Sequence, residues 1–335
     1  MVPLYVPKQV PRCGKSLIPF SSLHKYVFDV KKMRYIYIHG GIFMNYFNGK
    51  IILAPSKELA EEYASVNDIT ASVEAEYGDF VVPGRIVTLA HHGPRATSPA
   101  PCIAQQLPKI SSGTILVSHV DLDTLGGIMA LIGIKPIAPE FWQGAAFIDV
   151  MGPHHIYELS QGVQDLLNAY YAFNETNRSE RITTIADITE AIEPQIAAIT
   201  CLLGEDSPQK TEMLRKGVEW RERVTQAVED CLIDESQNVR VFRTHRVFCA
   251  SSYYSPKLGA IAKATVVLNE KFRAITVAFE DGGKAFSAKT IVQSLWGEEA
   301  GGRDGIAGSP RNWERTDTEL EEELKRAAKA VNELF

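Results

Sequence analysis

From residue 86 onward, short apolar runs alternate with segments whose apolar residues recur at helical spacing. Three such pairs follow one another, at residues 86–90 and 101–107, 114–118 and 124–134, and 145–150 and 156–171. An apolar strand without a polar face must be covered on both sides, and strands that alternate with helices achieve this in a parallel sheet. We therefore expect an α/β fold, a parallel sheet with helices on both faces.

The flanking segments have other patterns. Residues 33–89 hold mostly β-branched and aromatic runs, including 34–39, and one expected helix near 56–65 that Ser56 would cap. Residues 156–232 read as mainly helical, with a break at 204–208.

Strand-like runs return after residues 234–238, and an amphipathic helix closes the chain. Its apolar stripe comprises Leu320, Leu324, Ala327, Val331 and Leu334. These shifts predict three regions: a β-rich N-terminal extension at 1–84, an α/β domain at 85–235 and a smaller C-terminal α+β domain at 236–335.

Composition narrows the class of protein. The 335 residues are 45% hydrophobic and 23% charged, as in ordinary folded proteins. The net charge of -6 repels polyanions, so we expect no long nucleic acid as a partner. The five cysteines are scattered without a CxxC pair, which predicts neither a disulfide framework nor a structural zinc module and fits a cytoplasmic location. No apolar stretch is long enough to span a membrane.

The sharpest motif lies at residues 114–127, where an apolar strand runs into a polar turn and then a helix. If the backbone stays extended, His119, Asp121 and Asp123 project to one side at the carboxyl end of the strand, where ligands bind in open α/β sheets. A divalent cation would let both carboxylates stay ionised. Gly126 and Gly127 would let a ligand approach the backbone. The competing interpretation is that Asp123 caps the helix and its neighbours are solvated.

Two further motifs repeat this layout. Asp149 ends the apolar run at 145–150, and His154 and His155 follow it. His91 and His92 follow the run at 86–90. Because neighbouring parallel strands end at one edge of a sheet, these groups are expected to face the first motif. Imidazoles and carboxylates together suit manganese, iron or zinc.

A fourth motif is the glycine-rich segment at residues 297–311. Its backbone N–H groups and guanidinium groups could hold phosphate or carboxylate oxygens. The residues expected to do so are Gly301, Gly302, Arg303, Gly308 and Arg311. A plain connecting loop is the competing interpretation.

Together these motifs resemble the DHH phosphoesterase superfamily, over roughly residues 112–160 and 240–312. The resemblance implies a two-metal cluster, usually manganese, held by Asp and His at successive strand ends, and a C-terminal domain whose Gly-Gly loop binds the substrate. On this reading His119, Asp121 and Asp123 match the first motif, Asp149 is a strand-end ligand, and His154 and His155 match the last two letters of the name-giving motif.

The sequence departs from the family pattern, so the family motifs can be assigned to its residues in a second way, called here the second register. Pro153 stands where the family has its name-giving Asp, and Arg303 follows Gly301 and Gly302 where the family has His. In the second register His91 and His92 stand for the first motif, Asp121 for the second, and Asp187 for a later ligand. The departures also leave open a protein that has kept the fold and lost the reaction.

Our first hypothesis is therefore a metal-dependent phosphoesterase with two Mn²⁺ ions, or alternatively Zn²⁺ or Fe²⁺, that activates water against a phosphodiester or phosphoanhydride. Asp121, His154 and His155 would be catalytic; His154, with the other Asp and His residues, would also bind metal. The alternatives are a metallohydrolase of an amide bond and a catalytically silent protein that binds a nucleotide or anion. The expected partner is a small phosphorylated or short oligonucleotide substrate, with a homodimer left open.

Overall fold

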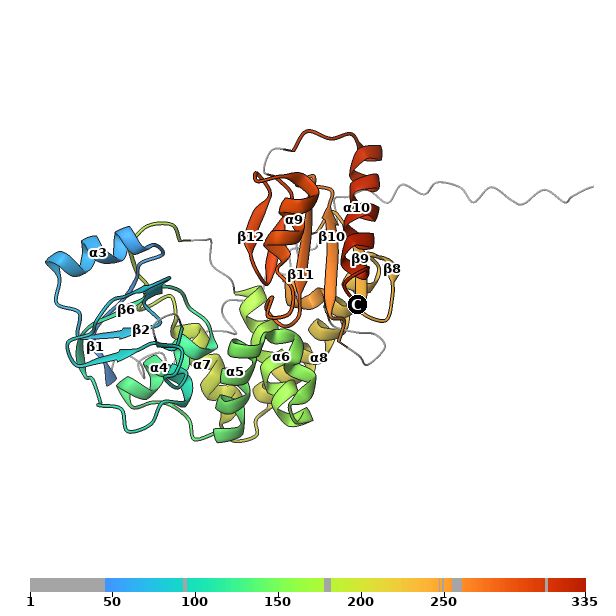
Figure 1. The fold of residues 1–335 in the computed structure, drawn as a ribbon. Helices are drawn as coiled ribbons and strands as arrows, with labels where there is room; N and C mark the ends of the chain where they lie inside the picture. Colours follow the sequence, from blue (N-terminus) through green and yellow to red (C-terminus); the bar gives the residue numbers. More distant parts are fainter. Residues whose placement is uncertain are drawn as a thin grey trace, which may run out of the picture. The chain divides into compact units, whose positions relative to one another are not determined.

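Two large sheets, a two-stranded ribbon and the helices around them make up the described part of the fold (Figure 1). The computed structural model describes residues 46–92, 95–177, 182–246, 248, 250–254, 261–310 and 313–335, all within one compact unit. The strand expected at 34–39 and the residue Arg311 lie outside the described residues.

The first sheet has five strands in the order β5-β2-β6-β1-β7. Its strands are β1 (Asn48–Leu53), β2 (Ala71–Val73), β5 (Val87–Leu89), β6 (Ser112–Val117) and β7 (Ala186–Asp187). The first four are parallel, as predicted, and β7 runs antiparallel to β1. Because β1 and β2 each pair with β6 of the expected α/β domain, residue 84 lies between strands of one sheet.

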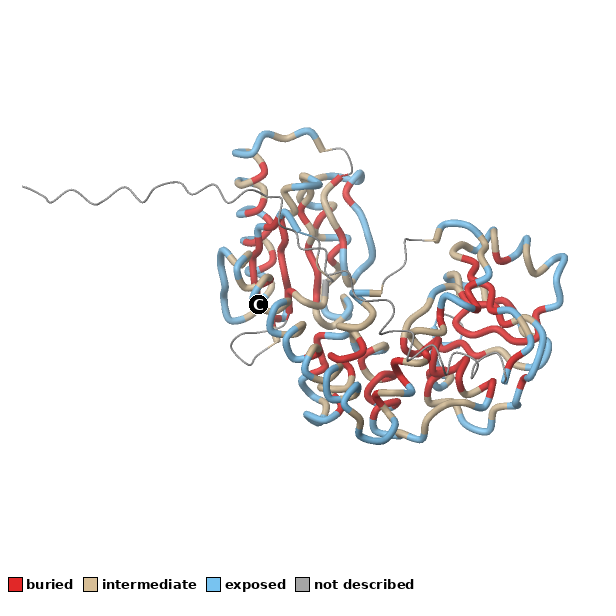
Figure 2. The backbone as a smooth tube through the Cα atoms, turned by 180° about the vertical axis from the view of Figure 1, so that it is seen from behind, coloured by how far each residue is buried: buried red, intermediate tan, exposed pale blue. Residues whose placement is uncertain are grey.

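Helices cover both faces of this sheet, which confirms the α/β prediction. Ile52 and Leu116 point to one face and share a buried cluster with Ala60 of α3 (Lys57–Val66). Their neighbours Ile51 and Ile115 point to the other face, toward α4 (Leu122–Ile132). The alternation follows from the two-residue period of a strand, and the second halves of β1 and β6 are buried (Figure 2). Ser56 caps α3 as predicted, its side chain accepting from Leu59 N.

Residues 145–150, expected as a strand, lie instead in a helix. They belong to α5 (Pro139–Met151), whose buried residues include Phe141, Ala145 and Ile148 at helical spacing. Pro139 stands in the first turn, where its fixed φ favours a helix start. A short apolar run is compatible with a buried helix as well as with a strand, so its pattern alone does not determine which of the two it forms.

The helical region after α5 follows the prediction. It contains η3 (Pro153–Glu158), α6 (Gln161–Thr176), α7 (Glu193–Leu203) and α8 (Pro208–Glu229). The predicted break at 204–208 separates α7 from α8, and Ser207 caps α8 by accepting from Lys210 N.

The second sheet has six strands in the order β12-β13-β11-β10-β9-β8. They are β8 (Leu232–Glu235), β9 (Val239–Thr244), β10 (Ala264–Asn269), β11 (Ala274–Phe279), β12 (Gly301–Arg303) and β13 (Ile306–Gly308). This sheet-rich region with its helices confirms the predicted α+β part. The expected boundary at 235 falls between β8 and β9, which pair with each other.

Both faces of the second sheet are packed. On one face lie α9 (Ala288–Trp296) and α10 (Asp317–Asn332). The predicted stripe of α10 is buried at Leu320, Leu324, Ala327 and Val331, while Leu334 packs at its edge. On the other face, Val228 at the end of α8 meets Phe242 and Tyr253, the latter in η4 (Ala250–Tyr253).

Two small elements complete the fold near the first sheet. The strands β3 (Glu76–Tyr77) and β4 (Phe80–Val81) pair as a two-stranded ribbon, and η2 (Pro101–Ile103) packs on α4. Within the described ranges, we find no helix with the length and apolar character needed to cross a bilayer.

Gly126 and Gly127 serve the packing of α4 rather than the approach of a ligand. A Cβ at Gly126 would lie 2.4 Å from Cys102 Cβ and 2.8 Å from Trp142 Cζ3. A Cβ at Gly127 would lie 2.7 Å from Pro101 Cβ. These glycines therefore let η2 lie directly on the first turns of α4.

This close approach makes a stability prediction. We expect Gly126→Ala to destabilise the protein by about 1–3 kcal/mol, because an extra methyl group in a filled interior forces its neighbours apart. Gly162→Ala is the matched control, since Gly162 lies in the first turns of α6 with nothing within 4 Å of the added Cβ. It should be neutral or stabilise by up to about 1 kcal/mol, the difference in helix propensity. Denaturant unfolding measures both, and equal effects would contradict the packing described.

Candidate metal centre

The candidate site is organised around Glu74, the residue that follows β2. Its side chain is 1% exposed. One carboxylate oxygen, Oε1, accepts a hydrogen bond from His91 Nε2 at 2.7 Å. The other, Oε2, accepts from Thr124 Oγ1 at 3.0 Å and lies 3.2 Å from His119 Nε2. Each oxygen of this single carboxylate therefore faces a different histidine.

Parallel strands bring these residues together. Glu74 directly follows β2, His91 comes two residues after β5, and His119 comes two residues after β6. Since β5, β2 and β6 are adjacent and parallel, all three chain segments leave the sheet at the same edge. This confirms the reasoning that the carboxyl ends of the strands gather polar side chains.

A first group of ligand atoms surrounds His91. Its Nε2 lies 3.2 Å from Asp123 Oδ2 and 3.2 Å from Asp149 Oδ2, in addition to Glu74. The His91 Nε2–H can donate only one well-aligned hydrogen bond, and Glu74 Oε1, the nearest of the three oxygens, accepts it. Asp123 Oδ2 and Asp149 Oδ2 are consequently buried without a hydrogen bond among the described residues. His92 flanks the group, with its ring centroid 3.9 Å from that of His91.

The backbone around η2 and α4 fixes Asp123 in this position. The Cys102 backbone N–H donates to Asp123 Oδ1 at 2.7 Å, which leaves Oδ2 to face His91. Asp123 lies in the first turn of α4 and is 1% exposed. The packing of η2 on Gly126 thus also sets the orientation of this carboxylate.

A second group consists of Glu74 Oε2, His119 and Asp121. His119 Nε2 lies 3.1 Å from Asp121 Oδ2. The Ser118 hydroxyl donates its proton to the Glu74 carbonyl and accepts from His119 Nδ1 at 2.8 Å. Because that contact occupies Nδ1, Nε2 is the ring nitrogen that faces the two carboxylates. Such an outer hydrogen bond, which fixes the tautomer, is typical of metal-binding histidines.

The electrostatics of the site depend on these contacts. Burial opposes the charged forms, but the carboxylates that surround each ring outweigh it and raise the pKa of His91 to about 12 and that of His119 to about 10. Burial likewise opposes ionisation of Glu74, yet the two histidines hold its pKa well below the usual range. Burial raises the pKa of Asp123. In the metal-free protein, protons on the histidines therefore compensate the buried carboxylates.

These donors fit divalent metal ions. Ligand atoms of Glu74, His91, His92 and Asp149 lie within 4.8 Å of one another, as do those of Glu74, His119 and Asp121. The buried oxygens that lack a hydrogen bond are the groups a cation would satisfy. Mixed carboxylate and imidazole donors suit manganese, iron or zinc better than calcium. The residues present could hold two ions, with Glu74 shared between them.

Most of the predicted residues from the strand ends meet here. Those that gather are His91, His92, His119, Asp121, Asp123 and Asp149. Some details differ from expectation. The backbone turns into α4 at once, so that Asp121 is the N-cap, accepting from Thr124 N at 2.9 Å, whereas the competing interpretation gave that role to Asp123. Asp149 reaches the group from the last turn of α5 and not from a strand end.

Other predicted residues lie in different surroundings. His154 and His155 gather with Glu280 in a group of their own. Asp187 accepts from Thr189 Oγ1 at 2.6 Å, and Thr189 in turn accepts from Ile51 N, so Asp187 supports the connection between β7 and β1.

The glycine-rich segment forms a hairpin. Gly301, Gly302 and Arg303 are in β12 and Gly308 is in β13. Gly302 has φ +152, and a Cβ there would lie 2.5 Å from Ala307 Cα, so the two strands require a glycine at this crossing. Arg303 is exposed.

The sequence-based search missed Glu74. It follows β2, which is only three residues long and carries too little pattern to stand out. Its φ of +50 places a non-glycine residue in the left-handed region, which costs about 1 kcal/mol or more and is typical of functional sites. An acidic residue directly after the buried run at 71–73 is the signal that could have found it.

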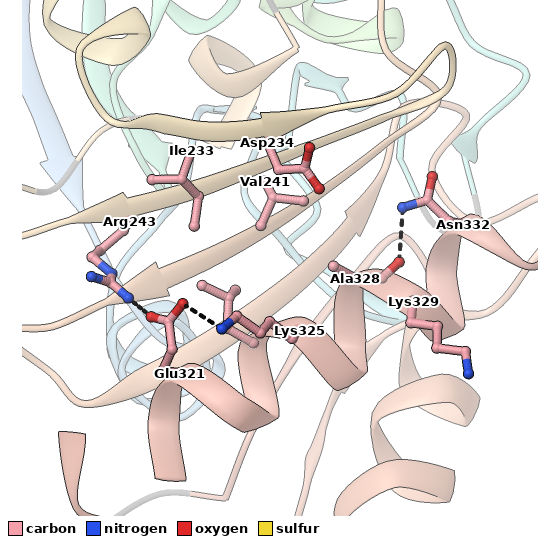
Figure 3. Close-up of a pocket in the computed structure, with 10 residues that line it drawn as sticks. Ile233, Asp234, Val241, Arg243, Glu321, Lys325, Ala328, Lys329 and Asn332 are labelled. Carbon is pink, nitrogen blue, oxygen red and sulfur yellow. Dashed lines mark hydrogen bonds and ion pairs between the residues drawn. The ribbon is translucent and has the colours of Figure 1, made fainter. Parts of the chain in front are cut away.

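A cavity of about 530 Å³ lies away from these groups, against α10 and the β8–β9 edge (Figure 3). Its charged residues are largely paired. Arg243 contacts Glu321, which also lies 3.5 Å from Lys325. Because Arg243 and Lys325 pair with Glu321, these side chains do not converge on a common point in the cavity where a substrate could react.

Comparison with known proteins gives structural matches only. No family model and no curated protein matches the chain. An exopolyphosphatase-related protein from Bacteroides fragilis is 13% identical, with a TM-score of 0.32 over 83% of this chain and 76% of that chain. The pGpG-specific phosphodiesterase PggH from Vibrio cholerae is 8% identical, with a TM-score of 0.39 over 77% and 85%. The exonuclease RecJ bound to manganese is 14% identical, with a TM-score of 0.33 over 82% and 78%.

TM-scores below 0.5 assign neither an activity nor a ligand to this chain.

Proposed function

We propose that this chain is a metal-dependent phosphoesterase that hydrolyses a phosphodiester or phosphoanhydride bond of a small or short nucleotide-like substrate. One observation carries the proposal: the two oxygens of the buried Glu74 carboxylate face two separate groups of ligand atoms. A shared carboxylate between two such groups suits a pair of divalent ions, for which we propose Mn²⁺.

The proposed ligands divide between the two groups. Glu74, His91, Asp123 and Asp149 would hold one ion, and Glu74, His119 and Asp121 the other. Bound divalent ions at such a site polarise a phosphoryl oxygen and supply a nucleophile at neutral pH. We propose this chemistry because the donors converge at the open edge of a parallel sheet.

We assign the polarising role to His92. Its side chain is 50% exposed, whereas that of His91 is 3% exposed. The His92 backbone N–H donates to both carboxylate oxygens of Glu76, at 3.0 and 3.2 Å, which fixes the residue beside the centre. From this position its ring could donate a hydrogen bond to a substrate oxygen as negative charge develops there. This role was expected of His154 and His155, which gather elsewhere.

The remaining proposed substrate contacts come from the β12–β13 hairpin. We keep Gly301, Gly302, Arg303 and Gly308 as candidates, because an exposed guanidinium beside glycine backbone suits a phosphate. Arg311 remains a candidate from the sequence alone.

The shared carboxylate makes a prediction about metal stoichiometry. We expect Asp149→Asn and Asp121→Asn each to lose one tightly bound Mn²⁺, and Glu74→Gln to weaken both ions. The expected loss in affinity exceeds about 100-fold, since removal of an outer partner alone costs about 10–100-fold. Equilibrium dialysis with elemental analysis measures it.

The control for this series is Asp206→Asn, whose carboxylate is 98% exposed. It should bind metal as the unmodified protein does. Circular dichroism of the metal-free variants checks the fold, which Asp149→Asn should keep because His91 retains two other carboxylates. Unchanged Mn²⁺ binding by folded Glu74→Gln would overturn the proposed centre.

Ser118 is predicted to position His119. Ser118→Ala removes the group that occupies His119 Nδ1, so the ring loses its fixed orientation. We expect metal affinity to fall about 10–100-fold. Ser65→Ala, which removes an exposed hydroxyl that donates to Glu62 O, should have no effect. Isothermal titration with Mn²⁺ compares them, and equal affinities would show that Ser118 does not orient the ring.

A substrate panel tests the reaction itself. With Mn²⁺, we expect release of phosphate or nucleotide from short oligonucleotides, a dinucleotide or inorganic polyphosphate, and no cleavage of amides. Glu74→Gln should lower kcat/KM by about 100-fold or more, the scale expected when electrostatic stabilisation of a transition state is lost. Cleavage of amides instead would favour the other metallohydrolase hypothesis. Tight ligand binding with no turnover and no bound metal would favour the silent binding protein.

A further inference from the structure

A second cluster of potential metal ligands lies outside the proposed centre. It joins His154 and His155 of η3 with Glu280, which follows β11. One ligand atom from each of the three lies within 4.8 Å of the others. All three belong to the same compact unit. The proposed phosphoesterase chemistry uses none of them.

His154 is buried without hydrogen-bond partners. Its side chain is packed between the rings of His155 and Tyr254, at centroid distances of 4.4 and 4.7 Å, and the residue is 7% exposed. Neither Nδ1 nor Nε2 makes a hydrogen bond in the part of the chain that the structure describes. Buried polar atoms are normally satisfied, so these nitrogens are candidates for binding an ion.

His155 has the arrangement of a metal-binding imidazole. Its Nδ1–H donates to Glu158 Oε1 at 2.5 Å. That bond leaves Nε2 to face Glu280 Oε2 at 3.8 Å, too far for a hydrogen bond. A carboxylate that accepts from the outer nitrogen of a histidine is the usual partner of a metal ligand, because it fixes the tautomer and makes the inner nitrogen a better donor.

Glu280 completes the set. Its Oε1 pairs with Lys263 Nζ at 3.1 Å, so that Oε2 is the oxygen left facing His155. Two ligand atoms that each lie about 2.0–2.2 Å from one zinc ion are at most about 4.4 Å apart. The distance of 3.8 Å between His155 Nε2 and Glu280 Oε2 is within this limit.

The backbone is also shaped for this group. Gly152 has φ +100, and a Cβ there would lie 2.5 Å from His154 Cε1. Only glycine leaves room for the ring at this turn, so the local fold holds His154 in place beside His155.

We propose that His154, His155 and Glu280 form a separate site for a single zinc-like divalent cation. Two imidazoles and one carboxylate are a donor set that zinc accepts, with a further position open to water or another ligand. The nitrogen content distinguishes this site from the carboxylate-rich centre at Glu74. Such an ion would join η3 to the end of β11.

Cobalt tests the proposal independently of the phosphoesterase centre. The untagged full chain carrying Glu74→Gln, in which metal binding at the first centre is expected to be weakened, is stripped with a chelator and titrated with Co²⁺. We expect one equivalent to bind and to give the strong visible absorption of four-coordinate cobalt, which added Zn²⁺ displaces. Added to the same chain, Glu280→Gln or His154→Gln should weaken this binding at least about 100-fold.

Two control variants in the Glu74→Gln chain separate ligation from its surroundings. Lys263→Met removes the ion pair but keeps the carboxylate, and His245→Gln removes a histidine whose side chain is 79% exposed; both should bind Co²⁺ as before. Should buried His154→Gln fail to fold, Glu280→Gln decides, since its side chain lies nearer the surface. Undiminished cobalt binding and absorption in folded Glu280→Gln would overturn the site. Loss of Mn²⁺ binding by Glu74→Gln alone bears on the first centre and not on this one.

Discussion

Several carboxylates buried together at one edge of a sheet are the constraint on which the rest of this structure depends. Glu74, Asp123 and Asp149 converge on a single imidazole nitrogen. Like charges so close, and so far from water, are tolerated only when cations lie among them. The ends of β2 and β5, the start of α4 and the last turn of α5 are all placed so that histidines or metal ions can supply that positive charge.

The sheet could be predicted from the sequence because its strands carry no polar face. The apolar run at 114–118 is β6 of this sheet, as expected. The run at 50–54 was assigned to a separate N-terminal extension, but the structure places it next to β6 as β1. The run at 145–150 looked the same but lies in α5, where Phe141 and Ile148 bury one side of a helix. A short apolar segment in the interior of a large core satisfies either period, so only the neighbouring elements decide.

The site could be predicted in part for a related reason. The side chains of His91 and His119 follow strands whose pattern is clear, and parallel pairing then brings them together. Glu74 follows a strand of three residues and adopts a left-handed conformation, neither of which sequence periodicity reveals. His154 and His155 were assigned to the same cluster as Asp149 because they follow the run at 145–150, which was expected to be a parallel strand ending at the same edge of the sheet, but that run lies in α5. The turn at Gly152 directs them elsewhere, toward Glu280.

Cys102 lies beside the candidate metal centre, but its thiol is buried and unreactive. Its backbone N–H holds Asp123, while its thiol is fully buried and donates to the Trp142 carbonyl at 3.4 Å. Burial, reinforced by the nearby Asp123, raises the pKa of this thiol beyond its ordinary range. Oxidants and alkylating agents attack the thiolate, which is almost absent here. The Cys102 thiol is thus unreactive in the folded protein, and an oxidant could attack it only after this region unfolds.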